Sequence, residues 1–573
     1  MRDRVLTTLV SALFLYILIG LFYTQIIRYP HYSRLSKNNS IRVIPIDGPR
    51  GNIFDRNGKV LVTNRLSFDV VIVYRELYKR SGIIRLLKDV LGMSGGDIAE
   101  ALEKASLRPN SPYTVKGDVP KEKAIAFEEE SCGLSGVSVQ TRSKRSYLYN
   151  NSGSHLFGYL SEVSEEELED LKDLGYRQRD LIGRSGLEKQ YNDYLKGVDG
   201  GTQVEVDSRG RQVKSLGLQE PESGKDLYLT IDVRLQAVCD KLLGSRNGAV
   251  VVINPKNGEV LALASHPAFD PNIFVKTGTS SERFRLLKDR IGRPMSNRAI
   301  SGLYAPGSVF KIVTASAALD TGKINHNTSF VCTGSYKLGR GKLDCWKAEG
   351  HGPQNIQNGL MNSCNVFFCN IGRLAGVDAL ESYAKLYGYG KKTGIDLPDE
   401  VDGLAPGRAW KMSRNKGSWY EGETLNYAIG QGYLMVTPIQ VARMTAVIAN
   451  KGSLVKPFVV KQIDKVHISA EKEKNIGLKD RTIEEIRRGL FEVINNEFGT
   501  GKRAKAEGVA AAGKTGTAQN PQGRTHAWFT GFAPYDDAKL CLVVFLEHGG
   551  KGGVEPASIA RGIFEEAKRI GYL

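Results

Sequence analysis

The stretch Pro306-Gly-Ser-Val-Phe-Lys311 decides the fold and chemistry of the C-terminal part of this chain. Its Ser-x-x-Lys spacing places the hydroxyl of Ser308 and the amine of Lys311 on one face of a helix, within hydrogen-bond reach. The apolar run Val309 to Leu319 predicts that this helix is buried. Because free backbone N–H groups at a helix start can stabilise an oxyanion, we expect Ser308 to be a nucleophile.

The spacing alone is a weak signal, because four other Ser-x-x-Lys sequences occur in the chain. They begin at Ser382, Ser413, Ser453 and Ser469. Ser413 and Ser469 lie among charged residues with no apolar helix behind them, which is typical of a solvated surface. Lys311 can act as a base only if burial or a second cation lowers its pKa.

A second motif, Lys514-Thr-Gly-Thr517, follows the small residues Ala510 to Gly513 and leads into two apolar runs. Small residues on an edge strand let a substrate backbone lie alongside it. Lysine and threonine side chains there can bind a carboxylate, and a glycine leaves room for the approach. The residues assigned to this substrate site are Lys514, Thr515, Gly516 and Thr517.

A third motif, Ser363-Cys-Asn365, lies between the other two, inside the apolar segment Leu360 to Ile371. The structural alternatives are a helix cap for Asn365 and a satisfied core hydroxyl for Ser363. The order of the three motifs along the chain favours a catalytic role for Ser363 and a binding role for Asn365.

The fold class is predicted to be α+β. Strands are expected at 227–231, 249–253, 260–264, 527–532 and 540–546, around a helix-rich middle. Strands contributed by both ends of one region indicate an antiparallel sheet closed by distant segments and flanked by helices, with a final helix at about 557–570 and a helical subdomain.

The N-terminus predicts a membrane anchor, because Val5 to Tyr23 holds no charged side chain and no small-residue cleavage site follows. Arg2 and Arg4 favour a cytoplasmic N-terminus, which would leave the rest of the chain outside the cytoplasm. We therefore expect a cytoplasmic tip and transmembrane anchor at 1–29, a mixed α+β pedestal domain at 30–222 and a catalytic domain at 223–573. The net charge of +17 is spread along the chain without a binding motif, so nucleic acid is not expected as a partner.

The three motifs, in this order, resemble those of the penicillin-recognising serine transferases. Nearly the whole chain is similar to class B penicillin-binding proteins, for example at Arg50-Gly-Asn-Ile-Phe-Asp-Arg-Asn-Gly58 and Gly183-Arg-Ser-Gly-Leu-Glu-Lys-Gln-Tyr191. The Gly430-Gln-Gly-Tyr433 sequence, and the two phenylalanines that follow Asn365 after one valine, resemble the elongation subgroup, penicillin-binding protein 2.

The resemblance implies a peptidoglycan D,D-transpeptidase in the bacterial inner membrane. Ser308 would form an acyl-enzyme with release of terminal D-Ala, Lys311 would be the base and Ser363 would move the proton. Asn365 would hold the donor amide, the 514–517 motif would hold the terminal carboxylate, and β-lactams would acylate the same serine. The alternatives are a D,D-carboxypeptidase or β-lactamase on the same fold, or a non-catalytic β-lactam sensor or scaffold. Expected partners are stem peptides, a polytopic SEDS-type glycosyltransferase and a rod-shape scaffold protein, contacted through the anchor and residues 40 to 220.

We expect no cofactor for the chemistry. We do expect a structural zinc site. Three thiols and an imidazole match a tetrahedral site, and they fall within a short stretch as Cys332, Cys345, His351 and Cys364. The alternatives are one disulfide with free thiols, since the seven cysteines cannot all pair within one chain, or small apolar core residues. The remaining four, Cys132, Cys239, Cys369 and Cys541, are expected in the core.

Overall fold

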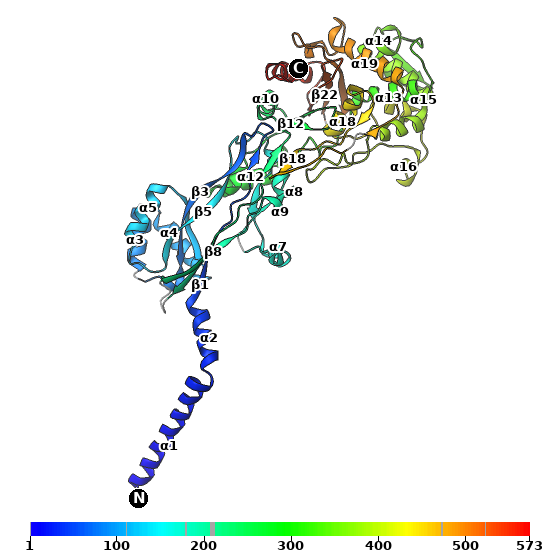
Figure 1. Cartoon of the computed structure of the whole chain (residues 1–573). Coiled ribbons are helices and arrows are strands. Elements are labelled where there is room, and N and C mark those ends of the chain that lie inside the picture. The colour runs from blue at the N-terminus through cyan, green and yellow to red at the C-terminus, as the bar shows by residue number, and fades with distance from the viewer. Residues whose placement is uncertain are drawn as a thin grey trace. The chain divides into compact units, whose positions relative to one another are not determined.

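The computed structural model describes residues 2–78, 80–110, 112–177, 180–206, 212–471, 474–521 and 523–573. The chain forms two compact units (Figure 1). The first comprises Met1–Gly51, Asn64–Arg145 and Lys196–Gly224, and the second comprises Asn52–Thr63, Ser146–Leu195 and Lys225–Leu573. The range 30–222 that the sequence assigns to a pedestal therefore contributes residues to both units.

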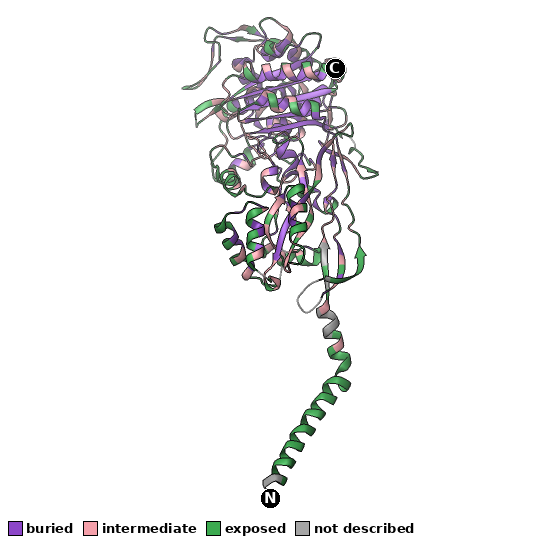
Figure 2. Cartoon of the chain, turned by 90° about the vertical axis from the view of Figure 1, so that its left-hand side faces the viewer, coloured by how far each residue is buried: buried purple, intermediate pink, exposed green. Residues whose placement is uncertain are grey.

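The first unit begins with helix α1 (Arg2–Phe22), the π-helical turn η1 (Tyr23–Ile27) and helix α2 (Tyr29–Ser40). Residues Arg4–Ile27 are long and apolar enough to cross a membrane, and nothing in the structure buries them. Figure 2 shows the described part of α1 in the colour of exposed residues along its length. Within the described residues this is the one helix that meets the length and polarity of a membrane span, as predicted.

Two sheets form the rest of the first unit. Strands β1 (Ile41–Ile46), β8 (Gly200–Val206) and β9 (Gln212–Gln219) make a three-stranded antiparallel sheet with β8 in the middle. Strand β3 (Val60–Val73) pairs with β4 (Pro112–Val119) and β5 (Val137–Tyr147). Helices α3 (Arg80–Asp89), α4 (Gly95–Ser106) and α5 (Lys121–Glu130) supply a small core with these strands, which includes Val70, Ile83, Leu87, Ile98 and Phe127.

The second unit is built on one antiparallel sheet of five strands. Their order is β12 (Val260–His266), β11 (Gly248–Ile253), β23 (Leu540–Leu546), β22 (Gly523–Ala533) and β21 (Ala512–Asn520). Strand β11 pairs with β23 so that Val251 lies opposite Val543. This confirms the prediction that segments from both ends of the region close a single sheet.

Both faces of this sheet are covered. Successive residues of a strand point to opposite faces, and Val250 and Val251 accordingly belong to different core clusters. Helices α10 (Val233–Leu243) and α20 (Glu555–Arg569) cover one face, and α18 (Pro438–Ala449) packs on the other. Figure 2 shows the strands of this sheet as buried, which explains why their sequences are continuous apolar runs.

A group of helices in the same unit carries the Ser308 and Ser363 motifs. The short 3₁₀ turn η4 (Gly307–Phe310) leads into α13 (Lys311–Asp320), which packs on α15 (Asn365–Leu386). Helix α14 (Ile356–Met361) packs on α19 (Asp480–Asn495), and α17 (Glu421–Ala428) packs on α15. Two of these elements, η4 and α19, contact strand β21 directly. The other elements of this unit that bear on the site are β13 (Phe330–Cys332), β14 (Ser335–Leu338), β15 (Gly341–Asp344), β16 (Gly352–Gln354) and η5 (Lys502–Ala504).

Smaller elements complete the second unit. Strand β10 (Leu227–Leu229) pairs with β2 (Ile53–Phe54) and β18 (Val460–Ile463), and β18 pairs with β19 (Val466–His467). The segment 165–195 forms the short helices α7 (Glu165–Leu171), η3 (Lys172–Leu174), α8 (Gly186–Gln190) and α9 (Asn192–Leu195). The rest are α6 (Ser154–Phe157), β6 (Leu160–Glu162), β7 (Leu181–Gly183), α11 (Asn272–Val275), α12 (Ser280–Lys288), α16 (Arg408–Ser413), β17 (Ser453–Leu454) and β20 (Lys474–Asn475).

Candidate active site

Ser308 lies on the η4 turn, which is pressed against strand β21. Gly307 has a φ of +53°, and a Cβ added there would lie 2.5 Å from the Thr517 carbonyl oxygen. On the other side, the Gly307 N–H donates to the Gly430 carbonyl at 2.9 Å. A side chain at either glycine would displace the turn, since a Cβ on Gly430 would lie 2.1 Å from the Gly307 oxygen. These close approaches fix Ser308 relative to the 514–517 motif.

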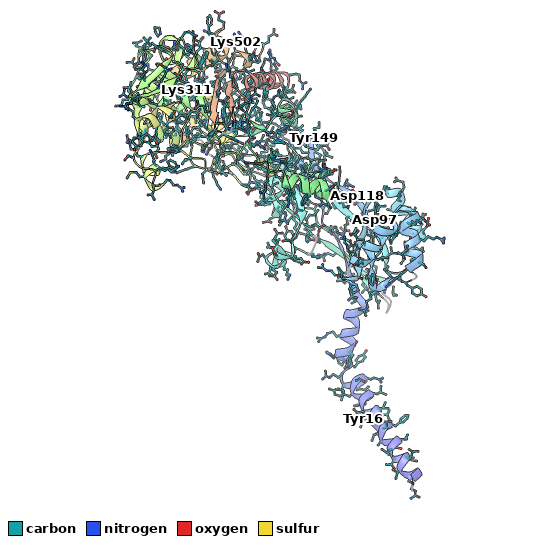
Figure 3. All side chains as sticks on the ribbon, turned by 180° about the vertical axis from the view of Figure 1, so that it is seen from behind. Tyr16, Asp97, Asp118, Tyr149, Lys311 and Lys502 are labelled. Atoms are coloured by element: carbon teal, nitrogen blue, oxygen red, sulfur yellow. The ribbon has the colours of Figure 1, made fainter. Side chains whose placement is uncertain are left out.

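Lys311 is completely buried behind the serine at the first position of α13, in the second unit (Figure 3). Its amine donates to the Ser363 carbonyl at 2.7 Å, to the Asn365 Oδ1 at 2.8 Å and to the Ser363 hydroxyl at 3.3 Å. Burial lowers its pKa to about 8, against the opposing influence of nearby cysteine thiols. The neutral amine that a base requires is therefore accessible near physiological pH.

The sequence predicts the Lys311 amine within hydrogen-bond reach of the Ser308 hydroxyl. In the part of the chain that is described, the structure instead gives this amine hydrogen bonds to Ser363 and Asn365. A buried ammonium needs acceptors, and the Ser363 carbonyl supplies one at the start of α15. The Ser308 hydroxyl is left to line the cavity.

Ser363 and Asn365 flank the start of α15. Ser363 is buried and has a φ of +51°, an uncommon conformation for a non-glycine residue, and this turn presents both its carbonyl and its hydroxyl to Lys311. The helix cap is Cys364, whose sulfur accepts from the Phe367 N–H at 3.4 Å, so Asn365 is not the cap. The Asn365 amide instead bridges the Lys311 amine and the Asp344 carbonyl, to which it donates at 3.0 Å.

Strand β21 carries the 514–517 motif at the free edge of the sheet. Lys514 is fully buried, and burial together with Lys311 holds its pKa well below the usual range. Its amine donates to the Thr515 carbonyl at 3.0 Å. Thr515 donates to the Thr500 hydroxyl at 3.1 Å, whereas Thr517 accepts weakly from the Gly552 N–H at 3.4 Å.

Gly516 serves packing more than substrate approach. A Cβ added there would lie 3.0 Å from the Trp528 Cβ and the Val309 Cγ1, and 3.1 Å from the Pro306 carbonyl. The missing side chain thus makes room for the η4 turn behind the strand. The interpretation of this glycine as an opening for substrate receives no support from its surroundings.

One cavity of about 1070 Å³ joins the predicted site residues. Its lining includes Ser308, Ser363, Asn365, Thr515 and Thr517, whereas Lys311 and Lys514 lie behind it. One side, the strand wall, consists of η4, β21 and the loop 547–554. The opposite side, the hairpin wall, consists of β14, β15 and residues 345–346.

The sequence did not identify the hairpin wall or Thr500. Tyr336, Leu338 and Leu343 line the cavity from β14 and β15, and Trp346 lines it with 61% of its surface exposed. In the sequence, Gly339 and Gly341 stand between two short runs in which apolar and polar residues alternate, a pattern that predicts a hairpin. Thr500 stands between two glycines just before η5. That pattern alone does not predict the hydrogen bond that its hydroxyl accepts from Thr515.

The four predicted metal ligands come together beside the site. The Cys332, Cys345 and Cys364 sulfurs and a ring nitrogen of His351 all lie within 4.8 Å of one another. His351 Nδ1 is 3.5 Å from the Cys345 sulfur and 3.6 Å from the Cys332 sulfur. A tetrahedral zinc with sulfur ligands at about 2.3 Å sets ligand-to-ligand spacings near 3.8 Å, so the residues fit this ion after a small contraction.

The cysteines test two of the sequence alternatives. All seven cysteines, each within the described residues, are free, so none of them forms the alternative disulfide. Cys239, Cys369 and Cys541 are buried as predicted, and burial raises the pKa of each thiol. The prediction for Cys132 is wrong, because this residue follows the end of α5 in an exposed turn.

Two family models match this chain. The penicillin-binding protein transpeptidase domain matches residues 248–565, and the penicillin-binding protein dimerisation domain matches residues 45–229. The chain belongs to the penicillin-binding protein transpeptidase family. This confirms the predicted resemblance and the α+β fold class with a C-terminal penicillin-recognising serine transferase fold.

Named relatives and solved structures of this family cover most of the chain. The peptidoglycan D,D-transpeptidase MrdA of Acinetobacter baumannii is 34% identical over 567 residues, which cover 95% of this chain and 84% of the relative. MrdA of Escherichia coli K12 is 33% identical, covering 93% and 88%. The complex of penicillin-binding protein PBP2 with MreC from Helicobacter pylori matches with a TM-score of 0.82 at 30% identity, covering 93% of this chain and 100% of that one. A second match is a chain from a peptidoglycan synthase complex that coordinates polymerization and crosslinking. Its TM-score is 0.76 at 30% identity, and the match covers 99% of this chain and 98% of that one.

Proposed function

We propose that this chain is a membrane-anchored, elongation-type peptidoglycan D,D-transpeptidase. The main support for this proposal is one cavity that Ser308, Ser363, Asn365, Thr515 and Thr517 all line. Behind it lie Lys311 and Lys514, whose pKa values are lowered by burial. The names of the relatives, D,D-transpeptidase and PBP2, support the same reaction and the elongation subgroup.

The first half-reaction transfers an acyl group to the serine. The Ser308 oxygen attacks the penultimate D-Ala carbonyl while neutral Lys311 takes its proton. The N–H groups of Ser308 and Thr517 stabilise the oxyanion, and Ser363 passes the proton to the leaving nitrogen as terminal D-Ala departs. The C–N bond breaks as the C–O ester bond forms.

The second half-reaction regenerates the serine. An amine of a neighbouring stem peptide attacks the ester, loses a proton to Lys311, and the Ser308 oxygen leaves with that proton. Asn365 holds the donor amide in both steps, and in the first half-reaction Thr515 and Thr517, which line the cavity with Lys514 buried behind them, hold the terminal carboxylate until D-Ala leaves. β-Lactams acylate the same serine as mimics of the D-Ala-D-Ala end.

The test of this assignment is the intact mass of the full-length chain after incubation with benzylpenicillin, beside Ser308→Ala. We expect one stable adduct on the natural chain and none on the variant. Rapid loss of the drug without an adduct would indicate a β-lactamase. An intact drug without an adduct would indicate a non-catalytic scaffold.

We propose that Cys332, Cys345, His351 and Cys364 hold a structural zinc ion, which would supply rigidity and no chemical step. Cys364 is the middle residue of the Ser363-Cys-Asn365 motif, and Cys345 follows β15, so the ion would tie this motif to the hairpin wall. Metal analysis of the purified chain should give about one zinc per molecule, and replacing Cys345 by Ser should remove it. A metal-free chain that keeps the same stability would contradict the proposal.

The arrangement at the membrane is also part of the proposal. Helix α1 is placed as a single span of the bacterial inner membrane, with Arg2 and Arg4 on the cytoplasmic side and the catalytic unit outside. A polytopic SEDS-type glycosyltransferase and a rod-shape scaffold protein are the proposed partners, because similar chains are solved with MreC and in a peptidoglycan synthase complex. Labelling of an introduced cysteine near residue 40 in intact cells checks the orientation.

A further inference from the structure

The cavity continues past the acylation site along strand β21, and this extension has no role in the chemistry described above. Thr515, Thr517 and Gln519 alternate along the strand and all three line the cavity. Side chains two residues apart on one face of a strand are about 6.7 Å apart. The cavity therefore offers one more position, at Gln519, beyond the carboxylate and acyl positions.

The chemistry fixes which part of the substrate reaches that position. An extended peptide that pairs with an edge strand advances about one residue per strand residue. With its reacting carbonyl beside the Thr517 N–H and its terminal carboxylate on the Thr515 side, the donor runs antiparallel to β21. The residue before the two D-alanines, the third of the stem peptide, then lies about one strand residue beyond Thr517, where a long side chain reaches the Gln519 position.

Lys551 lies on the loop that borders this position. Gly552 donates to the Thr517 hydroxyl, and a Cβ on Gly552 would lie 2.2 Å from the Gly516 carbonyl oxygen, so the loop backbone is held against β21. One residue earlier than Lys551, Gly550 exchanges hydrogen bonds with Thr525: its N–H donates at 3.0 Å and its carbonyl accepts from the Thr525 hydroxyl at 2.8 Å. Lys551 is therefore anchored on both sides, although its own side chain is exposed.

The charge of Lys551 is not used elsewhere in the described structure. The other lysine that lines the cavity, Lys342, pairs with Asp344 at 2.8 Å. Lys551 has no ion pair or hydrogen bond to its side chain among the described residues, and the amide of Gln519, which lines the same cavity, has none either. A cation and an amide that face a cavity together suit a carboxylate.

We propose that Lys551, with Gln519 and Thr525, forms the subsite for the third residue of the donor stem peptide and selects a side chain that ends in a free carboxylate, as diaminopimelate does. This inference rests on the proposed function, because that function sets the direction of the donor on β21. It predicts a preference against an amidated diaminopimelate or a lysine at this position, since neither offers an anion to Lys551.

The experiment measures how well three pentapeptides slow the acylation of the full-length chain by benzylpenicillin. The peptides end in D-Ala-D-Ala and carry meso-diaminopimelate, its amide or lysine as the third residue. We expect the free acid to compete about fivefold better than the other two, as one solvent-exposed ion pair allows. Lys551→Gln should reduce this ratio to about one, and Lys551→Arg should retain it.

The control variant is Lys502→Gln, which removes an equal charge from the same unit outside the cavity lining (Figure 3). It should keep the ratio of the natural chain. Equal competition by the three peptides, or an unchanged ratio in Lys551→Gln, would overturn the inference. Failure of benzylpenicillin to acylate the chain at all would instead overturn the proposed function, so the two failures are distinguishable.

Discussion

The strand wall and the hairpin wall of the cavity are built by different means. The strand wall is held by backbone approaches that tolerate no added Cβ, at Gly307, Gly430 and Gly552. Within the described residues, β14 and β15 pair as strands only with each other, and their residues are half-buried or exposed. The hairpin wall is joined to the catalytic residues by the Asn365 bond to Asp344 and by the cluster of three cysteines and one histidine proposed to hold zinc. The strand wall therefore fixes the positions of the reacting groups, whereas the hairpin wall shapes the cavity through which a substrate reaches them.

The largest effect should follow from removing the base behind the strand wall. Lys311→Gln should lower the rate of acylation by benzylpenicillin about a thousandfold, the loss typical of a general base. In the natural chain the pKa of Lys311 is lowered to about 8, so the rate should rise as pH increases from 7 to 9 and then level off, because the amine loses its proton over this range. Stopped-flow acylation across pH measures both. A rise that persists in Lys311→Gln would assign the titration to another group.

Breaking the packing of the strand wall should have the next largest effect. In Gly430→Ala the new Cβ would lie 2.1 Å from the Gly307 carbonyl oxygen, so the η4 turn must move. A shift of about 1 Å in a reacting group costs roughly a hundredfold in rate. The matched variant in the hairpin wall is Gly341→Ala, where the nearest atom would be 3.3 Å away and the rate should hardly change. Equal losses in both variants would remove the distinction between the walls.

Removing the proposed zinc ion should loosen the hairpin wall and lower the acylation rate less than the two changes to the strand wall. Cys345→Ser, or treatment with a strong chelator, should lower the thermal midpoint and reduce acylation about tenfold, as loss of a supporting contact at a site does. The effect reaches the reaction through Cys364, which lies between Ser363 and Asn365. Differential scanning calorimetry with zinc added back checks it. Restoration of the midpoint by zinc in the natural chain, but not in the variant, is expected.

The smallest effect should come from the tie between the hairpin wall and α17. Arg373 pairs with Glu421, both at exposed positions, and donates to the hydroxyl of the half-buried Tyr336 at 3.4 Å. Arg373→Gln should change peptide competition about twofold at most, because exposed pairs contribute little. Benzylpenicillin acylation should be unaffected. A tenfold loss of acylation in this variant would show that the hairpin wall also positions the reacting groups.

Several features were predictable because local pattern determines them. The uncharged run Val5 to Tyr23 gives a membrane-length helix in any fold, and continuous apolar runs give strands buried on both faces. The three motifs lie close together in the structure, and so do the four proposed zinc ligands, as their residue types and order indicated. In each case the residue types, their order and the local apolar context carried the information.

Other features depend on neighbours that are distant in sequence. The partners of the Lys311 amine arise from the uncommon backbone conformation of Ser363, which no sequence pattern announced. The packing role of Gly516 depends on Trp528 and Pro306 across the sheet. Cys132 is exposed because it follows a helix end in the first unit, although cysteine as a residue type is commonly buried.

Acyl transfer through Ser308 is tested most directly by product analysis. The full-length chain would be incubated with a pentapeptide ending in D-Ala-D-Ala and with a free amine acceptor, and the products followed by mass spectrometry. We expect one released D-Ala for each new donor–acceptor amide, and no product from Ser308→Ala. Release of D-Ala with only the hydrolysed tetrapeptide would contradict it and indicate a carboxypeptidase.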